Sequence, residues 1–189
     1  MGRPTARQRT TLAHRCEGRV MIKQGETLPD ATLFEFVEDA REGCTLGPNS
    51  FDVRKEAAGK RVVIFGLPGA FTPTCSAKHV PGYVEHYDAL RAAGVDEIWC
   101  VSVNDAFVMG AWGRDQRTSG KVRMMADGSA ALTRALGLEQ DLSARGMGIR
   151  SQRYAMVVDD GVVKTLNVEA PGKFEVSDAA SILATLTRA

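Results

Sequence analysis

Two kinds of feature are missing from this chain of 189 residues: paired cysteines and long hydrophobic runs. Its four cysteines, Cys16, Cys44, Cys75 and Cys100, are scattered, and no two of them form a Cys-x-x-Cys pair. Structural zinc sites and dithiol oxidoreductases of the thioredoxin type use such close pairs, so the spacing argues against both. Few, scattered cysteines are typical of a protein in a reducing compartment, and we expect a cytoplasmic location.

The uninterrupted apolar runs are only several residues long, far short of the roughly 20 residues that cross a bilayer. With 44% hydrophobic and 25% charged residues, the composition is that of a globular domain that does not enter a membrane. The net charge of +1 gives no reason to expect nucleic-acid binding, which needs a clustered basic face. Gly146-Met147-Gly148 lacks the third glycine of a dinucleotide fingerprint. We therefore expect no flavin, nicotinamide or metal cofactor.

The first 20 residues differ from the rest of the chain in charge. They contain five arginines and one glutamate, a net charge of +4, so the remainder carries −3. This segment lacks the apolar core of a secretory signal and shows no convincing amphipathic period. A mitochondrial-type presequence, a disordered tail and a start-site artefact ahead of Met21 all stay open, and we favour the last two. We expect one folded domain over residues 21–189, behind a basic leader at 1–20.

Cys75 has the most informative surroundings of the four cysteines. The β-branched and aromatic run 61–65 predicts a buried strand, and the Gly- and Pro-rich run 66–73 predicts a turn after it. Apolar residues spaced three and four apart over 80–90 predict a helix, so Cys75 falls in its first turn. Unpaired N–H groups and the helix dipole there favour a thiolate, whereas a free cysteine elsewhere is most often a small buried hydrophobe.

The remainder of the chain alternates between strand and helix patterns, which predicts an α/β fold with helices covering a parallel or mixed sheet. Asp159-Asp160-Gly161 predicts a hairpin, and Ser177 is expected to cap a C-terminal helix. Trp99, Phe107 and Trp112 are expected in the core. The further strands are expected at 96–103, 121–126, 154–158 and 162–166, further helices after 104–105 and at 129–136, and an N-terminal hairpin between 32–37 and either 45–46 or 51–53.

The motif Pro68-x-x-x-Thr72-x-x-Cys75 is the signature of the peroxiredoxins, and residues 69–76 resemble their type-five (type II, atypical) subfamily. The likeness continues through residues 79–83, 100–109 and 153–158, and it is closest to bacterial or plant-like one-cysteine members. The resemblance implies a thioredoxin-like fold with an added N-terminal β-hairpin. It also implies a homodimer, for which Phe71 and Trp112 are candidate contacts.

The resemblance further implies a peroxidase that reduces hydrogen peroxide and alkyl hydroperoxides. Cys75 would be the peroxidatic cysteine, Thr72 would offer its hydroxyl to the thiolate and the peroxide, Pro68 would shield the pocket, and Arg153 would hold the thiolate and polarise the peroxide. An arginine suits this task because it is always charged and presents several donors in one plane. His79 is expected to pack or hydrogen-bond rather than to act as a base, since a thiolate needs none.

The sulfenic acid formed on Cys75 must be reduced by a thiol, and no cysteine follows Cys100. Three routes stay open: glutathione with glutaredoxin, thioredoxin, or an internal disulfide with Cys100, which a mid-strand position would bury. Cys44 is expected to be a bystander and Cys16 to be silent. A redox-sensing protein whose assembly changes when Cys75 is oxidised is the alternative to an enzyme.

Overall fold

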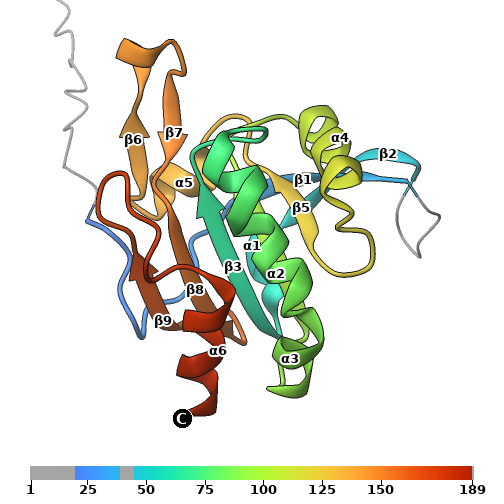
Figure 1. Ribbon diagram of the computed structural model, residues 1–189, viewed down its shortest axis with the longest axis vertical. Helices are drawn as coiled ribbons and strands as arrows, with labels where there is room; N and C mark the ends of the chain where they lie inside the picture. Colours follow the sequence, from blue (N-terminus) through green and yellow to red (C-terminus); the bar gives the residue numbers. More distant parts are fainter. Residues whose placement is uncertain (1–19, 39–44, 189) are drawn as a thin grey trace, which may run out of the picture.

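A computed structural model describes residues 20–38 and 45–188. Cys16, Cys44 and all but the last residue of the leader at 1–20 lie outside the described residues. Figure 1 shows a central twisted sheet with helices on both of its faces and a small separate two-stranded sheet, β6–β7, projecting at one end. The central sheet has seven strands in the order β2-β1-β5-β4-β3-β8-β9. This mixed sheet between helices confirms the expected fold class.

The strands alternate with helices along most of the chain. The strands are β1 (Thr32–Val37), β2 (Gly47–Asp52), β3 (Arg61–Leu67), β4 (Glu97–Ser102), β5 (Arg123–Ala126), β6 (Glu139–Asp141), β7 (Ile149–Ser151), β8 (Tyr154–Asp159) and β9 (Val162–Val168). The helices are α1 (Val53–Ala57), η1 (Cys75–His79), α2 (Val80–Glu85), α3 (Tyr87–Ala92), α4 (Ala106–Gln116), α5 (Ala131–Ala135), η2 (Ser143–Arg145) and α6 (Ala179–Thr187).

Strand β3 separates two apolar clusters because its side chains alternate between the two faces of the sheet. Val63, Phe65 and Leu67 belong to the cluster that also contains Cys75 and buried residues of α2, α4 and α6. Val62 and Ile64 point into the other cluster, which is formed with buried residues of α1 and α5. Strand β3 pairs in parallel with β4 and antiparallel with β8, so it lies at the centre of the fold. The segment that follows its carboxyl end leads directly to Cys75.

Both expected hairpins are present. Strand β1 pairs with β2 over 32–37 and 47–52, so the N-terminal hairpin uses the second of the two partners considered. The β8–β9 hairpin turns at Asp160-Gly161, where the φ angles are +48° and +75°. Two successive positive φ angles are typical of the tight turn that Asp-Gly predicts.

Two sequence predictions in the helices are wrong. Phe107 is 65% exposed, because the buried face of α4 is formed by Ala106, Met109 and Trp112; Trp99 and Trp112 are buried as expected. The cap of α6 is Asp178, whose carboxylate accepts from the Ser181 amide, whereas Ser177 is buried and donates its hydroxyl to Glu169. Ser and Asp are both good capping residues, and the sequence alone did not distinguish these neighbours.

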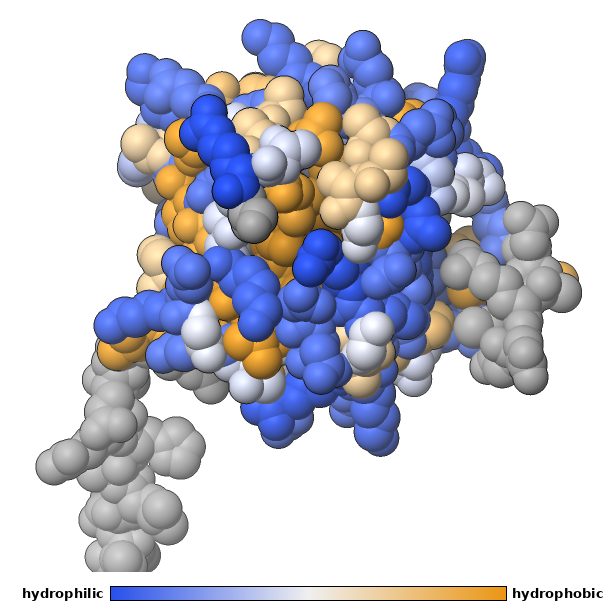
Figure 2. All heavy atoms as spheres, turned by 90° about the horizontal axis from the view of Figure 1, so that it is seen from below, coloured by the Kyte–Doolittle hydropathy of each residue, from blue (hydrophilic) through white to orange (hydrophobic). Residues whose placement is uncertain are grey.

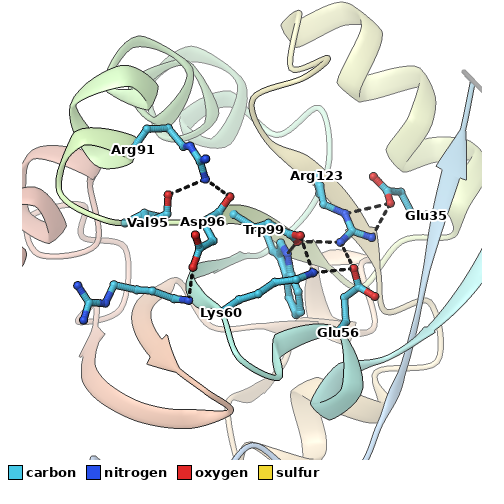
Figure 3. Close-up of polar contacts among 10 residues, drawn as sticks. Glu35, Glu56, Lys60, Arg91, Val95, Asp96, Trp99 and Arg123 are labelled. Carbon is cyan, nitrogen blue, oxygen red and sulfur yellow. Dashed lines mark hydrogen bonds and ion pairs between the residues drawn. The ribbon is translucent and has the colours of Figure 1, made fainter. Parts of the chain in front are cut away.

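A cluster of charged side chains ties the far end of the sheet together (Figure 3). Arg123 of β5 donates to Glu35 of β1 at 2.9 Å and to Glu97 of β4 at 2.8 Å, and it also contacts Glu56 of α1. Lys60 donates to Glu97 at 2.7 Å. Lys60 directly precedes β3, and Glu97 is the first residue of the parallel strand β4. This cluster therefore lies at the amino ends of these strands, and Cys75 follows the carboxyl end of β3.

The surface is mixed in character. Figure 2 views the end of the molecule where α3 and α6 lie in Figure 1, and hydrophobic atoms gather near its middle with hydrophilic atoms around them. Tyr87 of α3, with Leu183 and Leu186 of α6, packs against the apolar core and stays partly exposed. Among residues 20–38 and 45–188, we find no helix with the length and apolar character that a membrane crossing requires.

Candidate active site

The turn that carries Cys75 is wider than an ordinary α-helical turn. The Val80 amide donates to the Cys75 carbonyl, a bond across five residues, and Cys75–His79 therefore form a π-helical turn that leads into α2. Such turns recur at functional sites. The sequence predicts a helix start here; in the structure the first bond is α-helical, from the Ser76 amide to the Thr72 carbonyl at 3.0 Å, and the helix then widens to the π turn.

The loop before Cys75 is strained and tightly held. Phe71 has a φ angle of +59°, a left-handed conformation that bulky residues rarely adopt, and its ring is 56% exposed. The Ala70 amide donates to Asn104 Oδ1 at 3.0 Å, and Trp112 Nε1 donates to Ser76 Oγ at 3.0 Å. These bonds attach the loop to the segment that follows β4, and the π turn to α4.

Arg153 approaches Cys75 from β8, the strand that pairs with β3 on the side away from β4. It directly precedes β8, whose first residue, Tyr154, pairs with Gly66 near the end of β3. Its Nη2 donates to Cys75 Sγ at 3.4 Å, and its Nη1 donates to His79 Nδ1 at 2.9 Å. One guanidinium therefore contacts the first and the last residue of the π turn.

The contacts of His79 define its protonation state. An arginine can only donate, so His79 Nδ1 must be an acceptor, and the ring proton is on Nε2, which donates to the Ser177 carbonyl at 3.0 Å. Burial, and then the positive charge of Arg153, lower the pKa of His79 to about 3. The imidazole is neutral and its free lone pair is already used, so the expectation that it hydrogen-bonds rather than acts as a base fits this geometry.

Ser177 belongs to a loop held by the Glu169 carboxylate. Glu169 Oε1 accepts from the amides of Glu175, Val176 and Ser177 and from the Ser177 hydroxyl, each at 2.8 Å. Burial by itself raises the pKa of Glu169, but the bonds from Val176 and Ser177 outweigh it and lower the pKa. The charged form of this carboxylate is thus stabilised by the loop itself.

A cavity of about 800 Å³ opens beside the site, and its walls include Pro68, Thr72 and Arg153. Cys75 is fully buried and does not itself line the cavity; Arg153 contacts both the cavity and the sulfur. The Thr72 hydroxyl donates to the Gly69 carbonyl at 2.9 Å, so its lone pairs are available as acceptors. The exposed cations that line the same cavity are Lys78, Arg145 and Lys173.

Comparisons with known proteins agree with this geometry. The Redoxin family pattern matches residues 23–183. Peroxiredoxin-2B of Arabidopsis thaliana is 48% identical over 165 residues, covering 87% of this chain and 98% of that protein. The chain belongs to the peroxiredoxin family. Reduced Prx3 of Vibrio vulnificus in complex with hydrogen peroxide is 55% identical to this peroxiredoxin, covers 88% of it with 99% of its own chain, and has a TM-score of 0.81.

One similar structure carries a different description. A crystal structure from Burkholderia cenocepacia, described as a thioredoxin reductase, is 82% identical, with a TM-score of 0.87, and covers 88% of this chain and 98% of its own. The sequence of this peroxiredoxin has no Cys-x-x-Cys pair, which a dithiol reductase uses. The fold and the family match therefore decide the class: a thiol peroxidase with a thioredoxin-like fold.

Cys100 lies in the same apolar cluster as Cys75 and is fully buried in β4. Burial raises its pKa well above the usual range, and the neighbouring Cys75 raises it further. Cys100 therefore lacks the exposed, easily ionised thiol of a reactive cysteine. The expected mid-strand burial is confirmed.

The sequence prediction includes both residues of the central contact, Cys75 and Arg153, and two residues of the cavity wall. It omits Glu169, whose partners lie six to eight residues further on in an irregular loop. No short motif marks such a contact in the sequence. Among the residues that the structure describes, no cluster of His, Cys, Asp and Glu side chains is arranged to hold a metal.

Proposed function

We propose that this peroxiredoxin reduces hydrogen peroxide and organic hydroperoxides to water and alcohols at Cys75, and that glutathione with glutaredoxin regenerates the thiol. The observation that carries the proposal is the 3.4 Å contact between Arg153 Nη2 and Cys75 Sγ. A guanidinium beside a sulfur stabilises a thiolate, and it remains next to the oxygen that develops charge when the thiolate attacks.

In the first half of the cycle, the Cys75 thiolate attacks one peroxide oxygen. A sulfur–oxygen bond forms, the oxygen–oxygen bond breaks, and the leaving oxygen takes up the bond electrons and a proton to become water or an alcohol. Arg153 supplies donors to that leaving oxygen, where they act more strongly in the transition state than in the ground state. Cys75 is left as a sulfenic acid.

Thr72 and Pro68 would orient and enclose the peroxide. Because the Thr72 hydroxyl donates its proton to Gly69, its oxygen can accept a hydrogen bond from a neutral hydroperoxide. Pro68 contributes an apolar wall with no N–H group to the same cavity. Low water content around the sulfur would strengthen the electrostatic contribution of Arg153.

In the second half, a glutathione thiolate attacks the sulfenic sulfur: a disulfide bond forms, the sulfur–oxygen bond breaks, and the leaving hydroxide takes up a proton to become water. A second glutathione, or glutaredoxin, then takes the glutathionyl group and returns Cys75 to the thiol. Glutathione carries two carboxylates, and the Lys78, Arg145 and Lys173 side chains around the cavity are suited to attract them. The reducing compartment that supplies this thiol is, in our proposal, the cytoplasm.

Thioredoxin acting through a Cys75–Cys100 disulfide is the second candidate route. It draws on the proximity of the two thiols, which share one apolar cluster. It also requires local unfolding of a fully buried strand, so we place it behind the glutathione route.

A homodimer is part of the proposal. The exposed rings of Phe71, beside the active site, and Phe107, on α4, are apolar surface that a second copy would cover. Trp112, considered with Phe71 as a dimer contact, is fully buried within the chain and lies 6.2 Å from the Phe71 ring, so it would support that contact rather than make it.

Intact mass spectrometry after one equivalent of peroxide, followed by glutathione, tests the reaction. The proposal predicts a gain of one oxygen on Cys75 and then a glutathione adduct at the same residue. A loss of two hydrogens with a Cys75–Cys100 link would support the internal route. Oxidation of Cys75 that neither glutathione with glutaredoxin nor thioredoxin reverses would contradict the enzyme and favour a redox sensor.

A further inference from the structure

Arg153 is part of a closed ring of hydrogen bonds. The Arg153 backbone carbonyl accepts from the Glu169 amide at 2.9 Å. The Glu169 carboxylate holds Ser177, the Ser177 carbonyl accepts from His79, and His79 Nδ1 accepts from the Arg153 side chain. Four residues from three parts of the chain are thus linked in a circuit that begins and ends at the arginine.

The hydrogen-bonding roles of Arg153 and His79 in this circuit are fixed. Arg153 cannot accept, so it fixes the His79 tautomer, and that tautomer requires an acceptor at Nε2. The Ser177 carbonyl is this acceptor, and it also receives the Tyr83 hydroxyl at 2.9 Å. The buried His79 therefore transmits the position of the 169–177 loop to the guanidinium.

Phe174, in the same loop, packs against both partners. Its ring centroid lies 5.6 Å from Arg153 Cζ and 4.9 Å from the His79 ring centroid, the latter in an edge-on arrangement. An aromatic face near a guanidinium attracts it and limits its rotation. Phe174 is also part of the cavity wall, so the loop contacts the space that peroxide and reductant would enter.

We propose that His79 and Glu169 are positioning residues for the peroxidase reaction, and that the 169–177 loop, acting through His79, holds Arg153 in the geometry that activates Cys75. The inference rests on the proposed roles of Cys75 and Arg153. It adds that the loop is a control point, because a shift of Ser177 removes the second support of the guanidinium while the Cys75 thiol itself stays in place.

The test compares two rates in the reduced protein: oxidation of Cys75 by hydrogen peroxide and alkylation of Cys75 by iodoacetamide, the latter followed on the Cys75 peptide by mass spectrometry. Both rates are measured at pH 9.5, above the ordinary pKa of a cysteine thiol, about 8.5, so that the effect of Arg153 on thiolate formation is minimised and only the oxidation needs donors at a leaving oxygen. His79→Phe removes both ring nitrogens and is expected to slow oxidation about tenfold, the size of one hydrogen bond to a charged group. Alkylation should change by less than about threefold.

Two further variants and a control separate positioning from folding. In His79→Asn the amide oxygen replaces Nδ1 as the acceptor. The logarithm of its oxidation rate should therefore lie at least halfway from the His79→Phe value back to that of the unchanged chain. Glu169→Gln should slow oxidation about threefold, and the His79→Phe/Glu169→Gln double variant should be no slower than His79→Phe alone. His86→Phe is the matched control, because His86, between α2 and α3, contacts the Gly82 carbonyl through Nδ1 and is not part of this ring of hydrogen bonds.

The proposal is overturned if folded His79→Phe oxidises within twofold of the unchanged chain, if both rates change together, or if the Glu169 and His79 effects add. Should His79→Phe not fold, the Glu169→Gln rates alone decide in the same way. Failure of the proposed function looks different: in that case the unchanged chain itself would show no rapid oxidation of Cys75 by peroxide.

Discussion

Arg153 and Cys75 are separated by 78 residues along the chain, and their side chains meet at 3.4 Å. The contact depends on the antiparallel pairing of β3 and β8, which sets the start of β8 beside the end of β3. Neither side chain belongs to a regular strand: Arg153 directly precedes β8, and Cys75 follows β3 after the 68–74 loop. The sheet thus positions the reacting group and the charge that supports it.

Replacing Arg153 by methionine should slow the oxidation of Cys75 by roughly two powers of ten, because donors at the leaving oxygen are lost. Stopped-flow tryptophan fluorescence can follow this rate, since Trp112 donates to Ser76 next to the reacting cysteine. Arg134→Met is the matched control: Arg134 donates to the Ser129 carbonyl, outside the site. Equal rates in Arg153→Met and the control would refute the role of Arg153.

The exposed cations around the cavity, Lys78, Arg145 and Lys173, should act on the reductant and not on the peroxide. Arg145→Glu is expected to raise the KM for glutathione several-fold and to leave the rate of peroxide oxidation unchanged, because hydrogen peroxide is neutral and Arg145 lies in η2, outside the loop that supports Arg153. The effect should shrink as salt is added, since exposed charges are screened. Lys164→Glu, a charge reversal in β9 outside the cavity lining, is the control. An equal rise of the KM in both variants would contradict specific binding of glutathione by the cations around the cavity.

Acid should weaken the charged cluster at the far end of the sheet. Burial by itself raises the pKa of Glu97, but bonds from Lys60, Trp99 and Arg123 lower it overall. A lowered pKa in the folded state stabilises the fold above the pKa of the unfolded chain, about 4.3, and this contribution is lost as the pH falls through the folded value. Urea unfolding should therefore show that Glu97→Gln costs more stability at pH 7 than at pH 3. An equal cost at both pH values would contradict this assignment.

The sequence predicts those parts of the fold that have local causes. The Asp160-Gly161 turn and the start of α4 after 104–105 depend on residues within a few positions of each other, and both are as expected; the structure identifies Asp105 as the cap. The prediction that Phe107 of α4 lies in the core is wrong, because helical spacing fits more than one set of apolar residues. Which set is buried depends on the strands that the helix packs against, and the helix sequence does not contain them.

The candidate site divides in the same way. Cys75 stands out because strand, turn and helix signals coincide there, and Arg153 because its surroundings resemble a family. His79 is noticed in the sequence, but its tautomer follows only from its two contacts. Glu169 has no local signal, because its role depends on how the 173–177 loop folds back. Long-range contacts between irregular segments therefore have to be taken from the structure.

The most direct test of the account is steady-state consumption of hydrogen peroxide with glutathione and glutaredoxin in excess. We expect the unchanged chain, Cys16→Ser, Cys44→Ser and Cys100→Ser to turn over many times at similar rates, and Cys75→Ser to consume no peroxide. Turnover that persists in Cys75→Ser would contradict the assignment of the reacting thiol, and with it the role given to Arg153.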